Sequence, residues 1–327
     1  MNNLIVSSSP HIRGNTTTRR LMADVLISLV PCLIAGTIFF GFRALLVVVI
    51  TTATAVITEY VCRIIMKRPQ TAFDLSAAVT GMILGLILPP GCDFFAAMFG
   101  SVVAIVVIKQ MFGGLGQNFA NPASAARIII MLSFSSMLVY SGTNFMADVT
   151  TAATTSATSG ATDALTSATP LAAGSGVYSY LDLFLGNRGG CIGETSILAI
   201  LIGFVYLLVR KVINPIIPLT FAGSAALLAL ISGEDVLYTV MSGGLMFGAV
   251  YMATDYSTSP MTNWGKVVFG IGCGIITMGI RIYGRTPGAV SMPEGVSYAI
   301  LIMNIITPQI DSLFSPVPFG SKRRAVK

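Results

Sequence analysis

The sequence has few charged residues. Only 10% of its 327 residues are Asp, Glu, Lys or Arg, against roughly 25% in a typical soluble domain, while 54% are hydrophobic. The mean hydropathy of +0.83 comes from apolar runs spread along the chain, from residue 21 to residue 307. Because no single anchor accounts for this hydrophobicity, the composition excludes an ordinary soluble protein and predicts an all-α integral membrane protein.

Histidine and closely spaced cysteines are also scarce. His11 is the single histidine, which excludes a haem held by two histidines and argues against a His-rich metal site. The five cysteines stand far apart, without the spacing of zinc or iron–sulfur ligands, so we expect them to pack as small hydrophobic side chains. We predict no metal site, and the spacing leaves open whether Cys92 and Cys191 pair.

The net charge of +6 does not indicate a nucleic-acid partner, because Lys and Arg flank the apolar runs instead of forming a basic face with interleaved aromatic residues. With a cytoplasmic N-terminus, all basic residues except Arg43, Arg188, Arg281 and Arg285 fall at or near the cytoplasmic face. We therefore expect a multi-pass protein of the cytoplasmic (inner) membrane, in contact with lipid, with both termini cytoplasmic and the 142–190 loop external. The polar first 20 residues predict no cleavable signal peptide.

Apolar runs and their breakers predict about ten transmembrane helices. Their ranges are 21–40, 44–65, 75–89, 94–111, 123–141, 195–213, 216–232, 236–254, 266–284 and 295–307. These divide the chain into a cytoplasmic segment (1–20), a first five-helix repeat (21–141), an external loop (142–194), a second five-helix repeat (195–307) and a basic cytoplasmic tail (308–327).

Three sequence features recur in the same order in the two halves. A basic turn with a proline (67–69 and 210–215) precedes a helix, a glycine with acidic neighbours (91–93 and 233–235) ends it, and a polar segment ending near a proline (117–122 and 254–260) follows the next helix. The nearly constant spacing predicts two related halves of five helices each. Because five is odd, the second half is expected to be inverted in the membrane, as in many transporters whose sites form at the repeat interface.

The expected external loop has an unusual composition. Between residues 150 and 169, every residue except Asp163 and Leu165 is Ala, Gly, Ser or Thr. Composition alone favours a flexible linker.

A motif in this loop gives a second interpretation. Residues 163–169 read DALTSAT, which resembles Asp-x-x-Ser/Thr-Gly-Ala-Thr, the acceptor sequence for covalent FMN in the NqrB/RnfD family of membrane subunits. The resemblance implies that a flavin transferase joins the Thr169 hydroxyl to the FMN phosphate, with Asp163, Ser167 and Ala168 completing the attachment motif. Ser167 stands where the family usually has glycine, which is tolerated if the backbone there has a negative φ. A competing segment ends at Thr162, but it has Ser156 in place of the aspartate, so Thr169 is preferred.

The resemblance covers essentially the whole chain, and the short N-terminal segment is closer to the RnfD members. It implies a subunit of the Rnf complex, an ion-translocating (Na⁺ or H⁺) ferredoxin:NAD⁺ oxidoreductase, that carries electrons across the membrane through covalent FMN and a second, non-covalent flavin. Its partners would be an external flavoprotein subunit and a cytoplasmic NAD-reducing subunit, where the NAD chemistry occurs. Two alternatives stay open: a flavin-free secondary transporter with an inverted repeat, and a flavin-free scaffold within a redox complex.

A glycine-rich turn precedes the predicted fifth helix. The simpler interpretation is that Asn121 caps that helix and Pro122 occupies its first turn. The functional interpretation adds that Gly116 allows close backbone approach while Gln117, Asn118 and Asn121 offer amide donors and acceptors to a flavin edge. In the resembled family such a stretch lies near a second flavin, usually riboflavin, which would therefore bind here.

Ionisable residues also occur in or beside the apolar runs. Asp255 is the candidate for ion coupling, because it lies in the polar segment of the second half, near the hydroxyls of Thr254, Ser257 and Thr258. For the others we expect pairing with a neighbour or an interfacial position; they are Asp24, Glu59, Arg127, Glu194 and Arg281. No residue is predicted to act as a catalytic acid, base or nucleophile.

Overall fold

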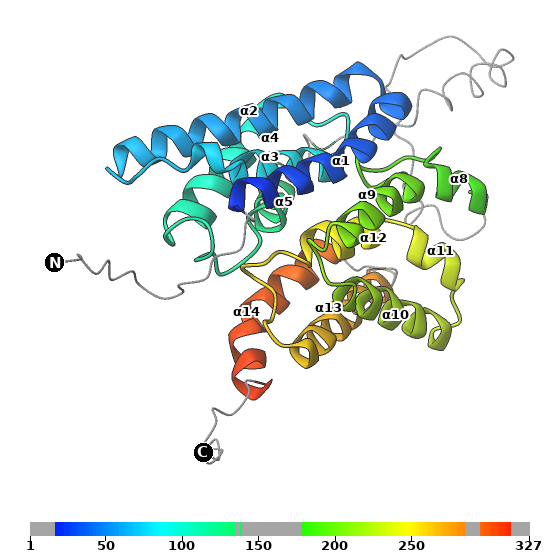
Figure 1. Cartoon of the computed structure of the whole chain (residues 1–327). Coiled ribbons are helices and arrows are strands. Elements are labelled where there is room, and N and C mark those ends of the chain that lie inside the picture. Colours follow the sequence, from blue (N-terminus) through cyan, green and yellow to red (C-terminus); the bar gives the residue numbers. More distant parts are fainter. Residues whose placement is uncertain (1–16, 135–137, 139–177, 285–294, 315–327) are drawn as a thin grey trace, which may run out of the picture.

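The computed structural model describes residues 17–134, 138, 178–284 and 295–314. All regular elements in these ranges are helices, as Figure 1 shows. The proposed attachment motif around Thr169 and the competing Thr162 lie outside the described residues.

Within the described residues, the first half contains five helical segments, and the predicted bounds lie within a few residues of the observed ones except for 123–141, where α5 ends at Ser133. They are α1 (Thr18–Phe40), α2 (Phe42–Ile65), α3 (Ser76–Ile87), α4 (Phe94–Val103), which continues into the π-helix η2 (Ala104–Gln110), and α5 (Pro122–Ser133). A short 3₁₀ turn, η1 (Ala72–Asp74), precedes α3. With 12 residues and a rise of about 1.5 Å each, α3 is too short to cross a hydrocarbon core of roughly 30 Å, as the sequence predicts.

The second half begins with the short helix α8 (Tyr180–Leu185). The remaining helices are α9 (Ile197–Val209), α10 (Ile216–Ile231), α11 (Val236–Met241), α12 (Leu245–Phe247), the π-helix η4 (Gly248–Met252), α13 (Asn263–Tyr283) and α14 (Val296–Phe314). The prediction of one continuous helix over 236–254 is wrong. Ser242 and Gly243 interrupt it, because Gly243 adopts a φ of 64°, which no α-helical residue has.

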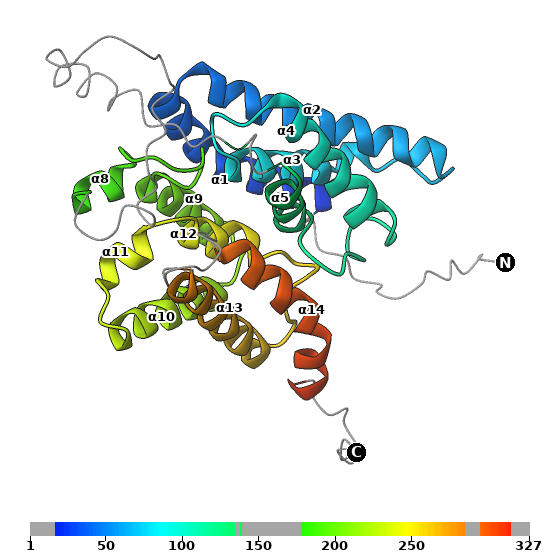
Figure 2. The ribbon, with the colours of Figure 1, turned by 180° about the vertical axis from the view of Figure 1, so that it is seen from behind.

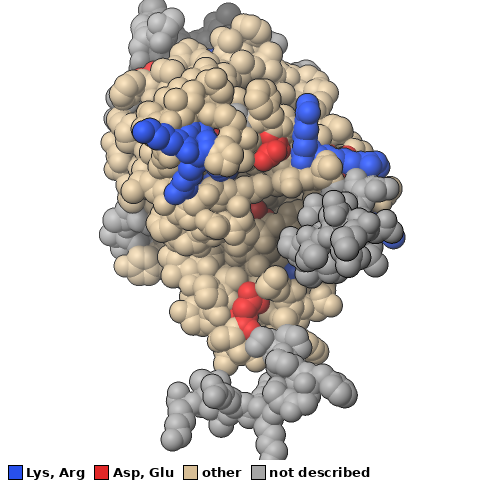
Figure 3. Space-filling model, turned by 60° about the vertical axis from the view of Figure 1, so that its left-hand side comes forward, with Lys and Arg blue, Asp and Glu red and all other residues tan. Residues whose placement is uncertain are grey.

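The surface agrees with a multi-pass membrane protein. Within the described residues, four helices are long and apolar enough to span a bilayer, namely α1, α2, α13 and α14, and five shorter apolar helices accompany them. Large apolar side chains are exposed along these helices, including Ile38, Ile65 and Val209. Figure 3 shows a face on which uncharged residues dominate and Lys and Arg side chains gather at a few places. The predicted all-α membrane fold is thus confirmed.

Small residues allow close approach in the two most extensively packed helix pairs, α2 with α3 and α10 with α13. Gly81 and Gly85, four residues apart on α3, face the backbone and small side chains of α2 so closely that an added Cβ would collide with them. Gly270 and Gly274 on α13 do the same against Thr220 and Ser224 of α10. This small-xxx-small spacing permits close helix packing where no hydrophobic effect drives helices together.

The packing repeats after five helical segments. In the first half α2 packs along α3 and α4, and in the second half α10 packs along α11 and α13. The two halves form the upper and lower layers of Figure 1 and meet where α1 packs on α9 and α5 on α14, as Figure 2 shows from behind.

The recurring sequence features pair different helices of the two halves from those that the packing pairs. Lys67 and Lys211 end α2 and α9 with the same left-handed cap, with φ values of 51° and 55°. The cap hydrogen bonds also match, from Arg68 N to Arg63 O (3.1 Å) and from Val212 N to Leu207 O (2.9 Å). The recurring features therefore pair α2 with α9, whereas packing pairs α2 with α10. The division into two repeats of five helices and the membrane orientation of each half stay predictions.

Candidate functional site

A cleft lies where the two halves meet. Its walls come from α1, α3, η2, the 115–123 segment, α9, η4 and residues 254–257, and it encloses about 780 Å³ including its open mouth. The polar side chains on its walls include Ser76, Thr80, Lys109, Asn118, Asn121 and Asp255. A largely apolar cleft with a few convergent polar groups is typical of a small-molecule site.

Asn121 and Pro122 have the structural role that the simpler interpretation predicts. The Asn121 Oδ1 atom accepts hydrogen bonds from Ala123 N (3.0 Å) and Ser124 N (3.3 Å), and Pro122 occupies the first position of α5. The Asn121 Nδ2 atom also donates to Met252 O (3.0 Å), at the end of η4. Asn121 thus links the start of α5 to the end of η4 across the two halves, and both Asn121 and Pro122 line the cleft.

Asn118 differs from Asn121 because its amide oxygen accepts no hydrogen bond from the described residues. The side chain is 9% exposed, and its Oδ1 atom is buried without a hydrogen-bond partner among the described residues. An unsatisfied buried amide costs about 1–3 kcal/mol, so a bound molecule with an N–H or O–H donor would be stabilised here. Asn118 is therefore the residue of the glycine-rich turn best suited to hold a ligand.

The other two candidates from this turn lie away from the cleft walls. Gly116 is exposed with a φ of 86°, and the space around its Cα is open. Gln117 is also exposed, and its side chain packs over Gly113. Both residues shape the turn and neither lines the cleft, so the structure narrows the predicted group to Asn118, Asn121 and Pro122.

Asp255 also lies at the cleft, although it is far from the glycine-rich turn in sequence. Its Oδ2 atom accepts hydrogen bonds from Ser257 Oγ (3.0 Å) and Thr258 Oγ1 (3.2 Å), while the Thr254 hydroxyl donates to Val250 O (2.6 Å). Desolvation raises the pKa of the Asp255 carboxyl above its usual range. In the described part of the chain, no three His, Cys, Asp or Glu side chains gather as a metal site would require.

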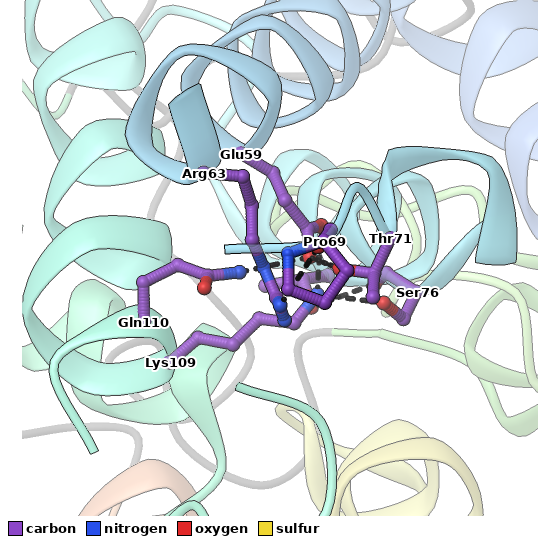
Figure 4. A network of polar contacts seen from close by, with 8 residues as sticks. Glu59, Arg63, Pro69, Thr71, Ser76, Lys109 and Gln110 are labelled. Carbon is purple, nitrogen blue, oxygen red and sulfur yellow. Dashed lines mark hydrogen bonds and ion pairs between the residues drawn. The ribbon is translucent and has the colours of Figure 1, made fainter. Parts of the chain in front are cut away.

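A buried ion pair lies directly behind the cleft wall. Lys109 Nζ is 3.0 Å from Glu59 Oε2 and 2.7 Å from Ser76 Oγ. The Glu59 carboxylate also accepts hydrogen bonds from Thr71 Oγ1 (3.1 Å) and Gln110 Nε2 (2.9 Å), and its side chain is fully buried. Figure 4 shows these side chains converging from α2, η2 and the start of α3.

The sequence predicts that Glu59 is paired but does not identify its partner. Glu59 and Lys109 are 50 residues apart, and the π-helical turn of η2 decides the direction of the lysine. The only sequence signal is the presence of opposite charges in two apolar runs of the same half, 44–65 and 94–111.

A second buried polar cluster lies at the other side of the interface. Arg127 pairs with Glu194 at 2.5 Å, and its other nitrogen is 3.2 Å from Cys191 Sγ. Arg188 donates to the carbonyl oxygens of Met241, Glu194 and Thr195, while Arg281 donates to those of Thr239 and Ser242.

These arginines stabilise a break in a helix. The carbonyls that Arg188 and Arg281 bind belong mainly to the last turn of α11, which has no following turn to satisfy them.

Cys92 and Cys191 are both free thiols, which answers the pairing question that the sequence left open, and burial raises the pKa of Cys191 to about 12. The expected pairing of intramembrane charges is confirmed, and it includes Asp24 with Arg210 at 3.2 Å.

The chain is similar to known proteins over nearly its whole length. The model of the NQR2, RnfD, RnfE family matches residues 5–320, nearly the whole chain. The chain belongs to this family. As a member of the NQR2, RnfD, RnfE family, it is 44% identical over 316 residues to the D subunit of the Na⁺-translocating ferredoxin:NAD⁺ oxidoreductase complex of Acetobacterium woodii, a match that covers 94% of this chain and 93% of the relative.

Two further family members show how wide the similarity is. The D subunit of the proton-translocating ferredoxin:NAD⁺ oxidoreductase complex of Clostridium ljungdahlii is 37% identical over 97% of this chain and 96% of its own. The D subunit of the ion-translocating oxidoreductase complex of Stutzerimonas stutzeri is 34% identical over 93% of each chain. The predicted relationship to the RnfD members is thus confirmed, while the relatives' names carry two different coupling ions.

Proposed function

We propose that this chain is the flavin-carrying membrane subunit of an ion-translocating ferredoxin:NAD⁺ oxidoreductase complex. The similarity to the D subunits of three such complexes over nearly the whole chain supports membership of one. The chain would pass electrons across the membrane through flavins, while partner subunits carry out the chemistry with NAD. Its partners would be an external flavoprotein subunit, a cytoplasmic NAD-reducing subunit and a flavin transferase.

The proposed covalent flavin is FMN, joined through a phosphoester to Thr169. The resemblance of residues 163–169 to the acceptor motif supports this assignment. Small neighbours such as Ala168 would let a transferase grip the backbone of this segment, and the Thr169 hydroxyl would supply the oxygen of the ester bond.

Fluorescence of the denatured protein tests the covalent flavin. The wild-type chain from native membranes should give a yellow fluorescent band on a denaturing gel, and peptide mass spectrometry should find FMN on the 142–190 peptide. The Thr169→Val variant should lose the fluorescence, and the matched Thr162→Val variant should keep it. Loss of flavin in only the Thr162 variant would overturn the assignment, and a colourless wild-type band would favour a flavin-free transporter or scaffold.

The second, non-covalent flavin is proposed to bind in the cleft, and riboflavin is the expected form. The unused Oδ1 atom of Asn118 is the observation that carries this proposal, because a flavin ring presents an N–H donor at its edge. Apolar wall residues such as Val79 and Ile83 offer contacts to the ring, and Asn121 with Pro122 holds the turn in place. When bound, the flavin would supply one- and two-electron transfer, while the chain binds, orients and desolvates it.

Extraction of the purified protein tests the second flavin. After acid denaturation, the supernatant of wild type and of Thr169→Val should contain about one riboflavin per chain, because the covalent and non-covalent sites are separate. A flavin-free supernatant from both proteins would contradict the cleft assignment.

Asp255 is proposed as the ion-coupling carboxylate. It lies at the cleft, and its carboxylate accepts hydrogen bonds from the hydroxyls of Ser257 and Thr258, which places three oxygen-bearing side chains together. Replacing Asp255 with Asn should change the cation dependence of electron transfer, and an unchanged dependence would remove Asp255 from consideration.

A further inference from the structure

Lys109 belongs both to the cleft wall and to the buried ion pair. Lys109 and Ser76 line the cleft, whereas Glu59, which also contacts the lysine, is fully buried behind them. The ammonium group is therefore the outermost charge of the network and the one closest to a molecule in the cleft.

The ammonium group has donor capacity left for such a molecule. It carries three N–H donors, of which Glu59 and Ser76 use two within the described residues. The lysine stem is long and flexible, so a small rotation would turn the charge from Glu59 towards the cleft.

The surroundings of Glu59 are rich in oxygen atoms. Thr71 and Gln110 donate to its carboxylate, and the Gln110 Oε1 atom is buried without a hydrogen-bond partner among the described residues. Carboxylate, amide and hydroxyl oxygens are the ligands that hard cations prefer. The site is thus able to accept a small cation in place of the lysine ammonium.

Charge balance connects the two sites. The pair is neutral while Lys109 faces Glu59, and an electron entering the cleft adds a negative charge in a medium of low dielectric constant. The ammonium would then be attracted towards the cleft, leaving the buried carboxylate without its ion-pair partner, which is costly unless a cation replaces the lysine.

We propose that the Glu59–Lys109 pair is a redox-linked cation site: Lys109 compensates an electron that enters the cleft, and Glu59 takes up one monovalent cation in exchange. This inference rests on the proposed flavin in the cleft and names positioning residues for it. One electron arrives from a one-electron reductant and one H⁺ or Na⁺ enters at Glu59; both leave when the cleft ligand is oxidised again. In the proton case the only bond that forms or breaks is the O–H bond of the Glu59 carboxyl.

Other charged groups surround the pair, and the experiment must take them into account. Arg63 of α2 and Asp255 of the 253–260 segment both act electrostatically on the Lys109 ammonium. Arg68 donates to the Gln110 carbonyl at 3.4 Å, and Asp74 lies in η1, which packs against α2. Within the described ranges, Glu59 and the Lys109 ammonium form hydrogen bonds with each other and with Thr71, Ser76 and Gln110, and not with these four charged residues. The four charges should therefore shift the flavin potential by the same amount in all the variants that are compared.

Spectroelectrochemical titration of the purified complex tests the proposal. The midpoint potential of the non-covalent flavin is measured at several pH values and several Na⁺ concentrations, with dithionite as the reductant. Lys109→Gln should lower the potential because it leaves only the negative charge, Glu59→Gln should raise it, and Lys109→Arg should keep it near the wild-type value. Asp24→Asn is the matched control, since Asp24 is a buried carboxylate paired with Arg210 that does not line the cleft.

The cation dependence distinguishes a proton from Na⁺. In the wild type, the potential should fall as pH rises if the cation is a proton, or rise with Na⁺ concentration if it is Na⁺, and Glu59→Gln should weaken that dependence. A redox difference infrared band of a protonated carboxyl, present in wild type and absent in Glu59→Gln, would identify the proton.

The outcomes separate this inference from the proposed function. If the double variant Glu59→Gln/Lys109→Gln, which removes the pair without leaving a lone buried charge, binds flavin with the wild-type potential and cation dependence, the redox-linked site is wrong and the cleft flavin stands. If wild-type protein holds no non-covalent flavin, the cleft proposal itself fails.

Discussion

The two buried polar clusters contain similar residues but differ in what their charges bind. In the cluster of Arg188 and Arg281, the guanidinium groups bind backbone carbonyls at the end of α11, and neither arginine lines the cleft. In the other cluster, Lys109 lines the cleft, and Gln110 retains a buried atom without a partner among the described residues. Arginine, with five donors in a rigid plane, suits fixed carbonyls, whereas lysine carries a mobile point charge. Burial of charge alone therefore does not indicate a functional site, whereas unused polar capacity beside a cleft does.

The largest effect is expected from breaking the arginine cluster. Arg188→Met should destabilise the protein by about 3–5 kcal/mol, because it leaves three buried carbonyls without donors. Heat-induced unfolding in detergent should show a large drop in melting temperature. Arg188→Lys should fall between this variant and wild type, since one ammonium cannot reach carbonyls arranged for a planar fork. A stability equal to wild type in Arg188→Met would show that the carbonyls find other donors.

The Glu59–Lys109 pair should behave differently in a double-mutant cycle. Lys109→Met alone should cost about 3–5 kcal/mol, because it leaves a buried carboxylate without its counter-charge. Adding Glu59→Gln should restore most of this stability, since the pair can be replaced by neutral groups. Chemical unfolding of both variants measures the coupling, and two additive losses would mean that the pair is not an isolated unit.

The two cleft asparagines should separate stability from binding. Asn121→Ala should cost about 1 kcal/mol through loss of the α5 cap, in addition to the bond to Met252 O. Asn118→Ala should leave the melting temperature nearly unchanged and weaken riboflavin binding about tenfold, as expected for one hydrogen bond to a buried amide. Fluorescence quenching on riboflavin titration measures the affinity. Equal affinity in Asn118→Ala and wild type would exclude Asn118 as a flavin ligand.

The smallest effect is expected at the exposed end of α11. Asp235 caps this helix, and a hydrogen bond from the Tyr180 hydroxyl lowers the pKa of its carboxyl. Because the folded-state pKa is depressed, the contribution is present above the unfolded value of about 3.9 and is lost as pH falls through the folded value. Tyr180→Phe should therefore be slightly less stable than wild type near pH 7, and this difference should shrink as pH falls below about 3.9 towards the folded value. Melting temperatures between pH 3 and 7 test this, and identical acid profiles would contradict it.

Sequence patterns of a few residues predict those structural features that depend on residues close together in the chain. The cap formed by Asn121 with Pro122 can be predicted from the sequence, because it depends on one side chain and two backbone amides within three residues. The partner of Glu59 cannot be predicted in this way, since Lys109 lies on another helix and the π-helical turn of η2 sets the direction of the lysine side chain. The interruption of the 236–254 run also escapes hydropathy, because Ser242 and Gly243 do not lower the apolar average enough to signal a break.

Of the residues proposed from the sequence, Asn118, Asn121, Pro122 and Asp255 line the cleft, whereas Gly116 and Gln117 do not. The assembly of the first four with Lys109 depends on tertiary contacts that no local pattern encodes.

Hydropathy, periodicity and short motifs act over a few residues, so the sequence was enough to indicate an all-helical membrane protein, the approximate bounds of its helices, its family and the local cap of α5. Tertiary packing was needed to bring the glycine-rich turn and Asp255 to one cleft, to place Lys109 between this cleft and buried Glu59, and to make the arginines cap a broken helix. Glu59 and Lys109 are 50 positions apart, and the direction of each side chain there depends on how whole helices pack.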